Sequence, residues 1–393
     1  MWLVAASAAS LIVSACLSSN PELSWYGSAW RRYGVIAQVA TLLLAWGVAA
    51  QASKVSSMLK IISAAGLITA LYGIAQYFGW DPILPAASYH IGEGVWTIVR
   101  PPSTLGYSSY FATWLLFIVF LSFDLPRWPG RFIAAICVVA MLLTGTRAAM
   151  LGLIAGAAVW LFWRGVRIPR KAIAIAGAVI VAAAAFYFSP PGQMVRARAR
   201  WYREDPWGGA RLLLWRDSAL MASAHPVFGF GPETFTANFP HYESRGLARA
   251  YPDFAHESPH NIFLDAFCAQ GFPGLLLMLA WCALGFAAAW RIRGKYPTTA
   301  AGLAGALAAG IASQLFTAFT VPTAVIFFAT IALADGLESG VTPPRRYIPL
   351  FAPLLYFAVR YVHLDRELAL TQHAIAARDL TSAAAHYAAS RNG

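Results

Sequence analysis

Long apolar stretches dominate this chain and limit what it can fold into. About eleven of them approach the length of roughly 20 residues that an α-helix needs to cross a bilayer, and together they occupy more than half of the 393 residues. Only 12% of the residues are charged, about half the share of roughly 25% found in soluble domains. A soluble globular enzyme and a disordered or collagen-like chain are therefore excluded. The sequence predicts an all-α, polytopic integral membrane helical bundle.

The predicted spans are separated by short basic connections or by longer polar ones. They cover residues 1–17, 35–52, 58–78, 108–124, 131–145, 146–164, 171–188, 261–291, 299–316, 320–337 and 347–362. Val13-Ser14-Ala15-Cys16 resembles a lipoprotein cleavage box, but no Lys or Arg precedes Arg31, and a signal peptide needs a positive amino-terminal region. The first stretch is therefore interpreted as a short membrane helix.

The basic residues predict the orientation of the spans, because short basic loops stay in the cytoplasm. Every lysine of the chain lies in or beside alternate connections, which places the amino terminus inside and, after eleven spans, the carboxyl terminus outside. The cytoplasmic set comprises Lys54, Lys60, Arg127, Arg131, Arg164, Arg167, Arg170, Lys171, Arg291, Arg293, Lys295, Arg345 and Arg346. Arg31 and Arg32 fall on the outer side, against the rule. In a soluble protein the net charge of +12 could indicate nucleic acid, but here orientation and anionic groups at the membrane explain it, so no nucleic acid is expected.

The predicted organisation has four parts: membrane helices in 1–188, a large outer loop in 189–260, further membrane helices in 261–362 and a tail in 363–393. The loop is too long for a simple connector, which favours a functional role. It contains eight arginines, no lysine, seven carboxylates and four histidines. The tail has apolar residues at helical spacing and resembles one helical hairpin of a tetratricopeptide repeat, which would dock on the body or on an envelope partner.

His260 is the candidate for acid–base chemistry. Ser258 is predicted to cap the following helix, with Pro259 at its first position, so that His260 lies in the first turn at the outer interface. A neutral imidazole there could take a proton from a hydroxyl group; the alternative is a histidine that only bonds neighbouring backbone. Asn261 and His256 are candidate supporting residues.

His256-Glu257-Ser258-Pro259-His260 also has the spacing of a zinc-protease motif, which requires both histidines on one helical face. Pro259 opposes a continuous helix, and no third ligand is obvious nearby. We therefore expect no metal.

Arginines are the second candidate group, because a guanidinium binds phosphate in a bidentate manner. Arg147 stands at the outer end of two apolar spans, where a charge at the membrane boundary suggests a function, and Arg100 closes another outer loop. Arg211 and Arg216 lie on a predicted amphipathic helix at the membrane surface, where Arg216 could instead pair with Asp217 or Asp205. The remaining loop arginines favour lipid headgroups; these are Arg196, Arg198, Arg200 and Arg203.

Several short motifs, in this order, give the chain a resemblance to the bacterial O-antigen ligases and polymerases, a family of membrane glycosyltransferases. They are Ser19-Asn20-Pro21 with Gly27-Ser28 and Arg31-Arg32; Arg100-Pro101 through Leu105-Gly106; Thr144-Gly145-Thr146-Arg147 with Gly152; Trp215 through His225-Pro226 and Gly229-Phe230-Gly231; and His260-Asn261 through Leu264, with Gly271 and Gly274.

The resemblance implies a GT-C-like bundle of 11–12 spans in the bacterial inner membrane, with a periplasmic loop over a cavity open to the bilayer. The expected donor is a glycan on undecaprenyl pyrophosphate, and lipid A-core or a growing glycan is the expected acceptor. By resemblance, His260 matches the family's histidine base, and Arg147 and Arg211 match positions that hold the pyrophosphate, without a metal or other cofactor. Twelve spans with both ends inside are usual in the family. Here either a helix is missing near the start or the tail is periplasmic.

The sequence leaves several functions open. Within the family, ligation to lipid A-core, polymerisation of repeat units and transfer to protein are difficult to separate. A glycolipid flippase is the alternative from another class, but such folds place polar groups at mid-membrane, whereas here they gather at the outer interface. A structural subunit of an envelope complex is a further alternative.

Overall fold

The computed structural model contains helices where the sequence predicts membrane spans. It describes residues 2–28, 30–82, 89–93, 96–165, 170–193, 195–196, 209–252, 254–340 and 352–392. The helices at the predicted spans are α1 (Trp2–Cys16), α3 (Val35–Ala50), α4 (Val55–Tyr77), α5 (Ser108–Leu121), α6 (Arg127–Leu143), α7 (Arg147–Arg164), α8 (Arg170–Phe188), α13 (Ile262–Ile292), α14 (Pro297–Gln314), α15 (Val321–Ser339) and α16 (Ala352–Ala376).

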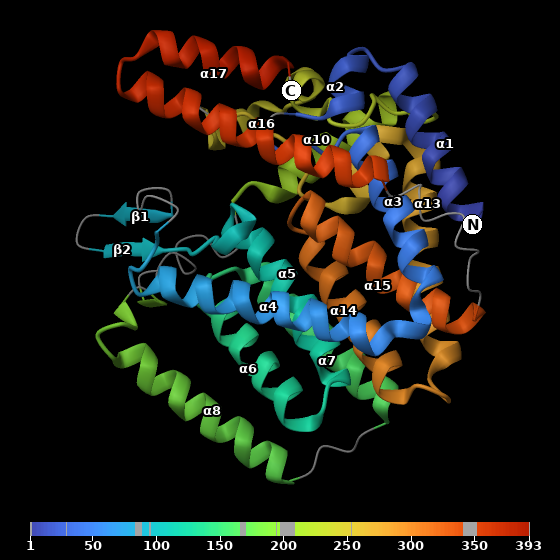
Figure 1. The fold of residues 1–393 in the computed structure, drawn as a ribbon, viewed down its shortest axis with the longest axis vertical. Helices are drawn as coiled ribbons and strands as arrows, with labels where there is room; N and C mark the ends of the chain where they lie inside the picture. Colours follow the sequence, from blue (N-terminus) through green and yellow to red (C-terminus); the bar gives the residue numbers. More distant parts are fainter. Residues whose placement is uncertain are drawn as a thin grey trace. The chain divides into compact units, whose positions relative to one another are not determined.

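Within the described residues, four helical segments are long and apolar enough to cross a membrane. They are α4 with the turn before it, α7, α13 and α15, and three shorter apolar helices accompany them. The predicted all-α, polytopic membrane class is therefore confirmed. The chain forms two compact units, residues 1–341 and 342–393, and Figure 1 shows the α-helical character of both.

The connecting segments carry shorter elements. They are α2 (Pro21–Tyr26), η1 (Ala52–Lys54), η3 (Ser103–Leu105), η4 (Ser122–Asp124), α10 (Arg211–Ala224), α11 (Phe235–Asn238), η5 (Phe239–His241) and α12 (Arg245–Ala250). Strands β1 (His90–Glu93) and β2 (Trp96–Val99) pair antiparallel as a small hairpin, with His90 opposite Val99. The predicted loop arginines Arg198, Arg200 and Arg203 lie outside the described residues, as does Asp205.

Small residues let α7 and α14 approach closely. A Cβ atom on Gly152 would lie 2.7 Å from the carbonyl oxygen of Ala309, and one on Gly156 would lie 2.7 Å from that of Gly305. Lipid tails supply no hydrophobic driving force between membrane helices, so association depends on such close van der Waals packing. This packing fixes the amino-terminal end of α7, where Arg147 lies, beside the carboxyl-terminal end of α14.

The second unit is a helical hairpin. α17 (Leu380–Asn392) packs along α16, and Nδ1 of His386 lies 2.7 Å from Oε2 of Glu367. α16 continues without a break through the predicted boundary between 362 and 363, because that part of the sequence contains no proline or glycine. The predicted docking of this hairpin on a partner stays a prediction.

Candidate active site at the start of α13

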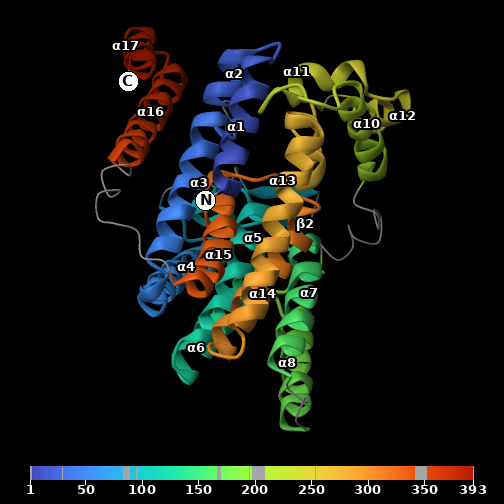
Figure 2. The ribbon, with the colours of Figure 1, turned by 90° about the vertical axis from the view of Figure 1, so that its right-hand side faces the viewer.

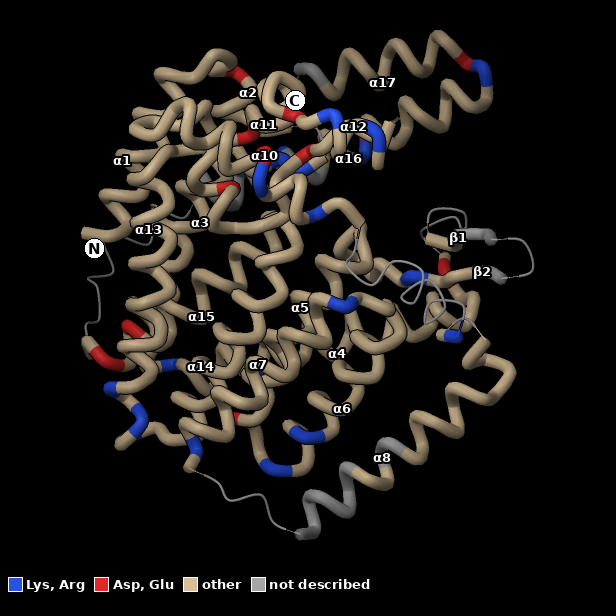
Figure 3. Tube along the Cα trace, turned by 180° about the vertical axis from the view of Figure 1, so that it is seen from behind, with Lys and Arg blue, Asp and Glu red and all other residues tan. Residues whose placement is uncertain are grey.

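The candidate site residues lie at one end of the helices of the first unit. Figure 2 shows α10, α11 and α12 beside the first turns of α13. At the opposite end, Arg291 on α13 binds Glu338 on α15 at 2.8 Å and Arg164 on α7 donates to Thr298 at 3.0 Å. Figure 3 shows basic positions at the ends of α6 and α14, away from α10 and α12. Arg164 and Arg291 therefore lie at the end of the helices opposite to the candidate site.

The start of α13 corrects the predicted helix cap. The helix begins at Ile262, and the Asn261 side chain caps it by accepting hydrogen bonds from the N–H groups of Phe263 (3.0 Å) and Leu264 (3.2 Å). Ser258 is not the cap and Pro259 is not in the first turn. His260 has φ +50°, a left-handed conformation that interrupts a helix, so the helix starts only after it.

His260 is therefore held just before α13 and not in its first turn. The Ser258 hydroxyl accepts a hydrogen bond from the His260 N–H at 3.3 Å and lies 3.2 Å from Nδ1 of the imidazole. Burial lowers the pKa of His260 to about 4, helped by the positive charge of Arg211 and by His256 and Arg31. The imidazole is therefore neutral at neutral pH, as a proton acceptor must be.

A glycine-bearing turn supports this part of α13 from outside. The N–H of Phe230 donates to the Cys268 carbonyl at 2.9 Å, and the N–H of Gly231 donates to the Ala269 carbonyl at 3.0 Å. α13 is kinked at Gly271, whose φ is +66°, and a Cβ there would overlap the Pro226 carbonyl. The kink leaves backbone carbonyls of α13 without the hydrogen bonds that they would accept in an unbroken helix. The N–H groups of Phe230 and Gly231 donate to these carbonyls instead.

Arg211 and Arg216 both lie on α10 but have different surroundings. Arg211 starts the helix, close enough to His260 to lower the pKa of its imidazole, and its guanidinium lies 5.7 Å from the ring centre of Phe316. Arg216 instead contacts Oδ1 of Asp217 at 2.8 and 2.9 Å, one of the two pairings that the sequence leaves open. α10 also packs on α13 through buried residues such as Leu214 and Met221.

Arg100 and Arg147 both adjoin the turn that joins α6 to α7. Nε of Arg100 donates to the carbonyl oxygen of Thr144 at 3.5 Å, in the turn that joins α6 to α7. Arg147 is the first residue of α7, immediately after that turn. The structure thus brings Arg100 to the turn that precedes Arg147, and Arg211 to His260.

His256 does not share a helical face with His260, because residues 256–260 are not helical. The side chain of His256 is buried among the rings of Phe239, Tyr251 and Phe254, with Nε2 3.7 Å from the Glu243 carboxylate. Burial lowers the pKa of His256, although Glu243 opposes the shift. In the described part of the chain, no group of three His, Cys, Asp or Glu residues is spaced to hold a metal ion.

A buried network of ion pairs adjoins the start of α13. Arg31 binds Glu233, and its Nη1 lies 2.8 Å from Oδ2 of Asp265 on α13. Ser28 donates to the other oxygen of Glu233 through its N–H at 3.1 Å and its hydroxyl at 2.5 Å. Motif reasoning missed this network, although Arg31 had a signal: an arginine on the outer side, against the distribution of the other basic residues.

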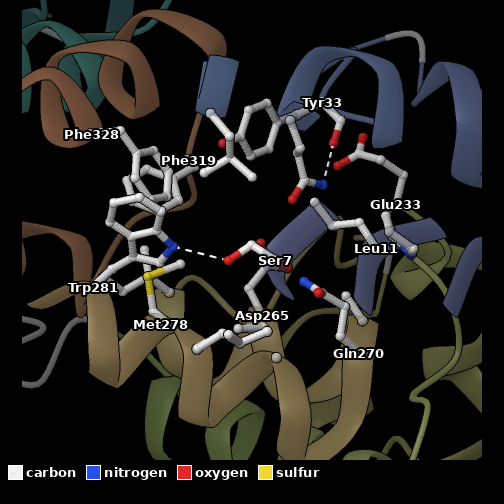
Figure 4. A pocket seen from close by; sticks show the side chains of 18 of the residues that line it. Ser7, Leu11, Tyr33, Glu233, Asp265, Gln270, Met278, Trp281, Phe319 and Phe328 are labelled. Carbon is white, nitrogen blue, oxygen red and sulfur yellow. Dashed lines mark hydrogen bonds between the residues drawn. The ribbon is translucent and has the colours of Figure 1, made fainter. Parts of the chain in front are cut away.

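A cavity of about 60 Å³ lies beside the network, between α1, α3, α13 and α15. Arg31, Glu233 and Asp265 are among its lining residues. Figure 4 shows Trp281 and Phe328 together on the side of the cavity away from Glu233. This volume accommodates a few water molecules but no sugar. His260 does not line the cavity, so we distinguish this cavity from the candidate active site.

These features define a class: a polytopic α-helical membrane protein in which a neutral imidazole and guanidinium groups share one end of the bundle. Residues 132–279 match the family model described as O-antigen ligase. Over 209 residues the chain is 29% identical to an O-antigen ligase of Pseudomonas aeruginosa, an alignment that covers 53% of this chain and 40% of that protein. The predicted resemblance to the O-antigen ligase family is therefore confirmed, and the matched region contains His260, Arg147 and Arg211.

Proposed function

We propose that this protein is a membrane glycosyltransferase that moves a glycan from undecaprenyl pyrophosphate to a sugar hydroxyl, as an O-antigen ligase with lipid A-core as acceptor. The observation that carries the proposal is a buried His260 imidazole just before α13, whose pKa is lowered by burial and by the positive charge of Arg211, so that it is neutral. Such a pair supplies a proton acceptor and a binding group for diphosphate within one site. The similarity to O-antigen ligases supports this substrate class.

In the proposed reaction, His260 is the general base. If Nδ1–H donates to the Ser258 hydroxyl, Nε2 carries the lone pair and takes the proton of the acceptor hydroxyl. That hydroxyl oxygen forms a bond to the anomeric carbon while the bond from this carbon to the pyrophosphate oxygen breaks. A single displacement inverts the configuration at that carbon.

Arg147 and Arg211 are proposed to hold the pyrophosphate and to neutralise the charge that develops on it as it leaves. Arg100 would support Arg147 through the Thr144 turn. Arg216 is left out of the donor site, since its guanidinium contacts the Asp217 carboxylate. Donor binding would also place negative charge beside Arg211, which raises the pKa of His260 and makes it a stronger base for the reaction.

We further propose that the site faces the periplasm and that the protein resides in the bacterial inner membrane. Arg164 and Arg291 lie at the end of the helices opposite to the start of α13, and short basic connections stay in the cytoplasm. The donor and acceptor lipids would then reach the site from the outer leaflet. The α16–α17 hairpin is a proposed contact surface for an envelope partner.

The testing experiment compares surface glycan lengths in a strain that lacks this protein and in its parent. A ligase predicts long chains that persist on undecaprenyl pyrophosphate and vanish from lipid A-core. Single repeats on the core would instead support polymerisation, and an unchanged ladder would contradict both activities. Complementation with His260→Ala should fail, whereas His241→Ala, an exposed histidine of the same loop, should restore the ladder.

A further inference from the structure

Arg31 is one of the most deeply buried charges in the described chain, and its burial is balanced by two carboxylates. The side chains of Arg31 and Glu233 are 4% and 1% exposed, and that of Asp265 is 18% exposed. Although burial opposes the charge of Arg31, Asp265 and Glu233 outweigh it and raise the pKa of the guanidinium. In turn, Arg31 and Ser28 outweigh burial and lower the pKa of Glu233. Arg31 and Glu233 therefore stabilise each other's charged forms, and Asp265 is the second carboxylate that Arg31 binds.

The two carboxylates belong to the two segments that flank the candidate site. Glu233 follows Pro232 in the loop and has φ +64°, an unusual conformation for a non-glycine residue. Asp265 lies in the first turn of α13, and its N–H donates to the carbonyl of Asn261 at 2.8 Å. Asn261 is the residue directly after His260. Arg31 thus connects the loop at residue 233 to the first turn of α13, which begins two residues after His260.

His260 itself has few constraints of its own. Its φ of +50° is unfavourable for a residue with a side chain, and among the described residues its hydrogen bonds go to Ser258. Such a conformation persists only where the surrounding structure over-determines it. Ser258 fixes it from the loop side. On the helix side, the Arg31–Asp265 ion pair holds the first turn of α13.

We propose that Arg31 is a positioning residue for the transfer reaction: by binding Glu233 and Asp265 together, it fixes the first turn of α13 and so the placement of the His260 imidazole. This inference rests on the proposed function. Arg31 does not contact the reacting atoms; it acts through Asp265 and Asn261. A bidentate guanidinium is required because a lysine ammonium cannot span two carboxylates with fixed geometry.

The test uses the full-length protein in membranes, with undecaprenyl-pyrophosphate-linked glycan as donor. Arg31→Lys and Asp265→Asn are compared with Arg291→Lys, which alters an exposed arginine–carboxylate pair at the other end of the bundle. A misplacement of about 1 Å lowers rates by about 100-fold, so both site variants should lower kcat by about 10- to 100-fold. The donor KM should stay within about twofold, because donor binding is assigned to other arginines, and Arg291→Lys should keep wild-type kcat.

A second measurement does not depend on activity. Hydrogen–deuterium exchange of the wild type and Asp265→Asn should differ at residues 258–265 and agree in the rest of α13, because only the first turn loses its ion pair with Arg31. Wild-type kcat in Arg31→Lys, or unchanged exchange at 258–265, would overturn the positioning role. A loss of kcat that is fully explained by a smaller amount of folded protein would also overturn the positioning role. A wild-type protein that transfers no glycan, yet shows the exchange difference, would instead overturn the proposed function.

Discussion

The hydroxyl of Ser14 on α1 lies 2.6 Å from the carbonyl oxygen of Ala269 on α13, two residues before the kink at Gly271. The same hydroxyl lies 2.7 Å from the carbonyl of Phe228 in the loop. Three segments that are remote in sequence therefore meet at one buried serine, which is 2% exposed. These contacts hold the large loop against α13, the helix that begins just after His260.

Replacement of this serine should loosen the loop measurably. Ser14→Ala removes the donor and leaves two carbonyls with one partner fewer, which costs about 1–2 kcal/mol. We expect a lower melting temperature in detergent and faster proteolysis of residues 209–250. Ser223→Ala is the matched control, because its hydroxyl bonds only within its own exposed helix at Ala219. Equal stability of the two variants would contradict the assigned role of Ser14.

Gly271 should tolerate no side chain. Its φ of +66° is unfavourable for other residues, and a Cβ would overlap the Pro226 carbonyl, so Gly271→Ala adds strain of about 1–3 kcal/mol and pushes the loop away. Thermal unfolding and glycan transfer would both be measured, and both should decline. Gly294→Ala provides the comparison, because nothing lies within 4 Å of its Cβ position. A wild-type melting temperature in Gly271→Ala would show that the turn does not depend on the kink.

The helices were predictable because each arises from a local apolar run, and the α6–α7 boundary from the short turn at Thr144-Gly145-Thr146. The docking of the loop on α13 was not predictable from the sequence. Ser14, Phe228 and Ala269 carry no pattern that relates them, since single hydrogen bonds between distant segments leave no periodic signal. The predicted cap at Ser258 was wrong for a related reason: both Ser258 and Asn261 suit the position, and only the tertiary fold sets φ of His260.

The candidate site was predictable in part. His260, Arg147 and Arg211 stand out because charge and imidazole are costly at a membrane boundary. The pairing of Arg31 with Glu233 and Asp265 joins residues more than 200 positions apart, and only the unexpected side of Arg31 indicated it. The aromatic surroundings of His256 likewise come from residues spread over the loop, so its packing could not be predicted.

The arginines proposed for the donor should respond to loss of bidentate geometry. Arg147→Lys and Arg211→Lys keep the charge but lose the guanidinium fork, and hydrogen bonds to charged groups contribute about 1.5–3 kcal/mol each. We expect kcat/KM for the lipid-linked donor to fall by about 10- to 100-fold, measured with purified protein. Arg245→Lys, an exposed arginine on α12, should stay close to wild type. A fall in kcat/KM no larger than that of Arg245→Lys would remove either residue from the donor site.

The pH profile should report the environment of His260. The base must be neutral, so kcat/KM falls as the pH drops through the pKa of the free enzyme, which burial, Arg211, His256 and Arg31 lower to about 4. The acidic limb should therefore lie well below the usual value of about 6.5. Arg211→Gln removes a positive charge that opposes protonation, so the pKa of His260 rises and the limb moves to higher pH. The exposed Arg249→Gln should leave it in place.

The same experiment distinguishes the free and donor-bound states. The acidic limb of kcat reports the pKa of His260 in the enzyme–donor complex. In that complex the negative charge of the diphosphate offsets the positive charge of Arg211, so the pKa of His260 rises. The wild-type limb in kcat should therefore lie at higher pH than the limb in kcat/KM, and the separation should shrink in Arg211→Gln. Coincident limbs in the wild type, or a shift to lower pH in Arg211→Gln, would show that the guanidinium does not act on the imidazole.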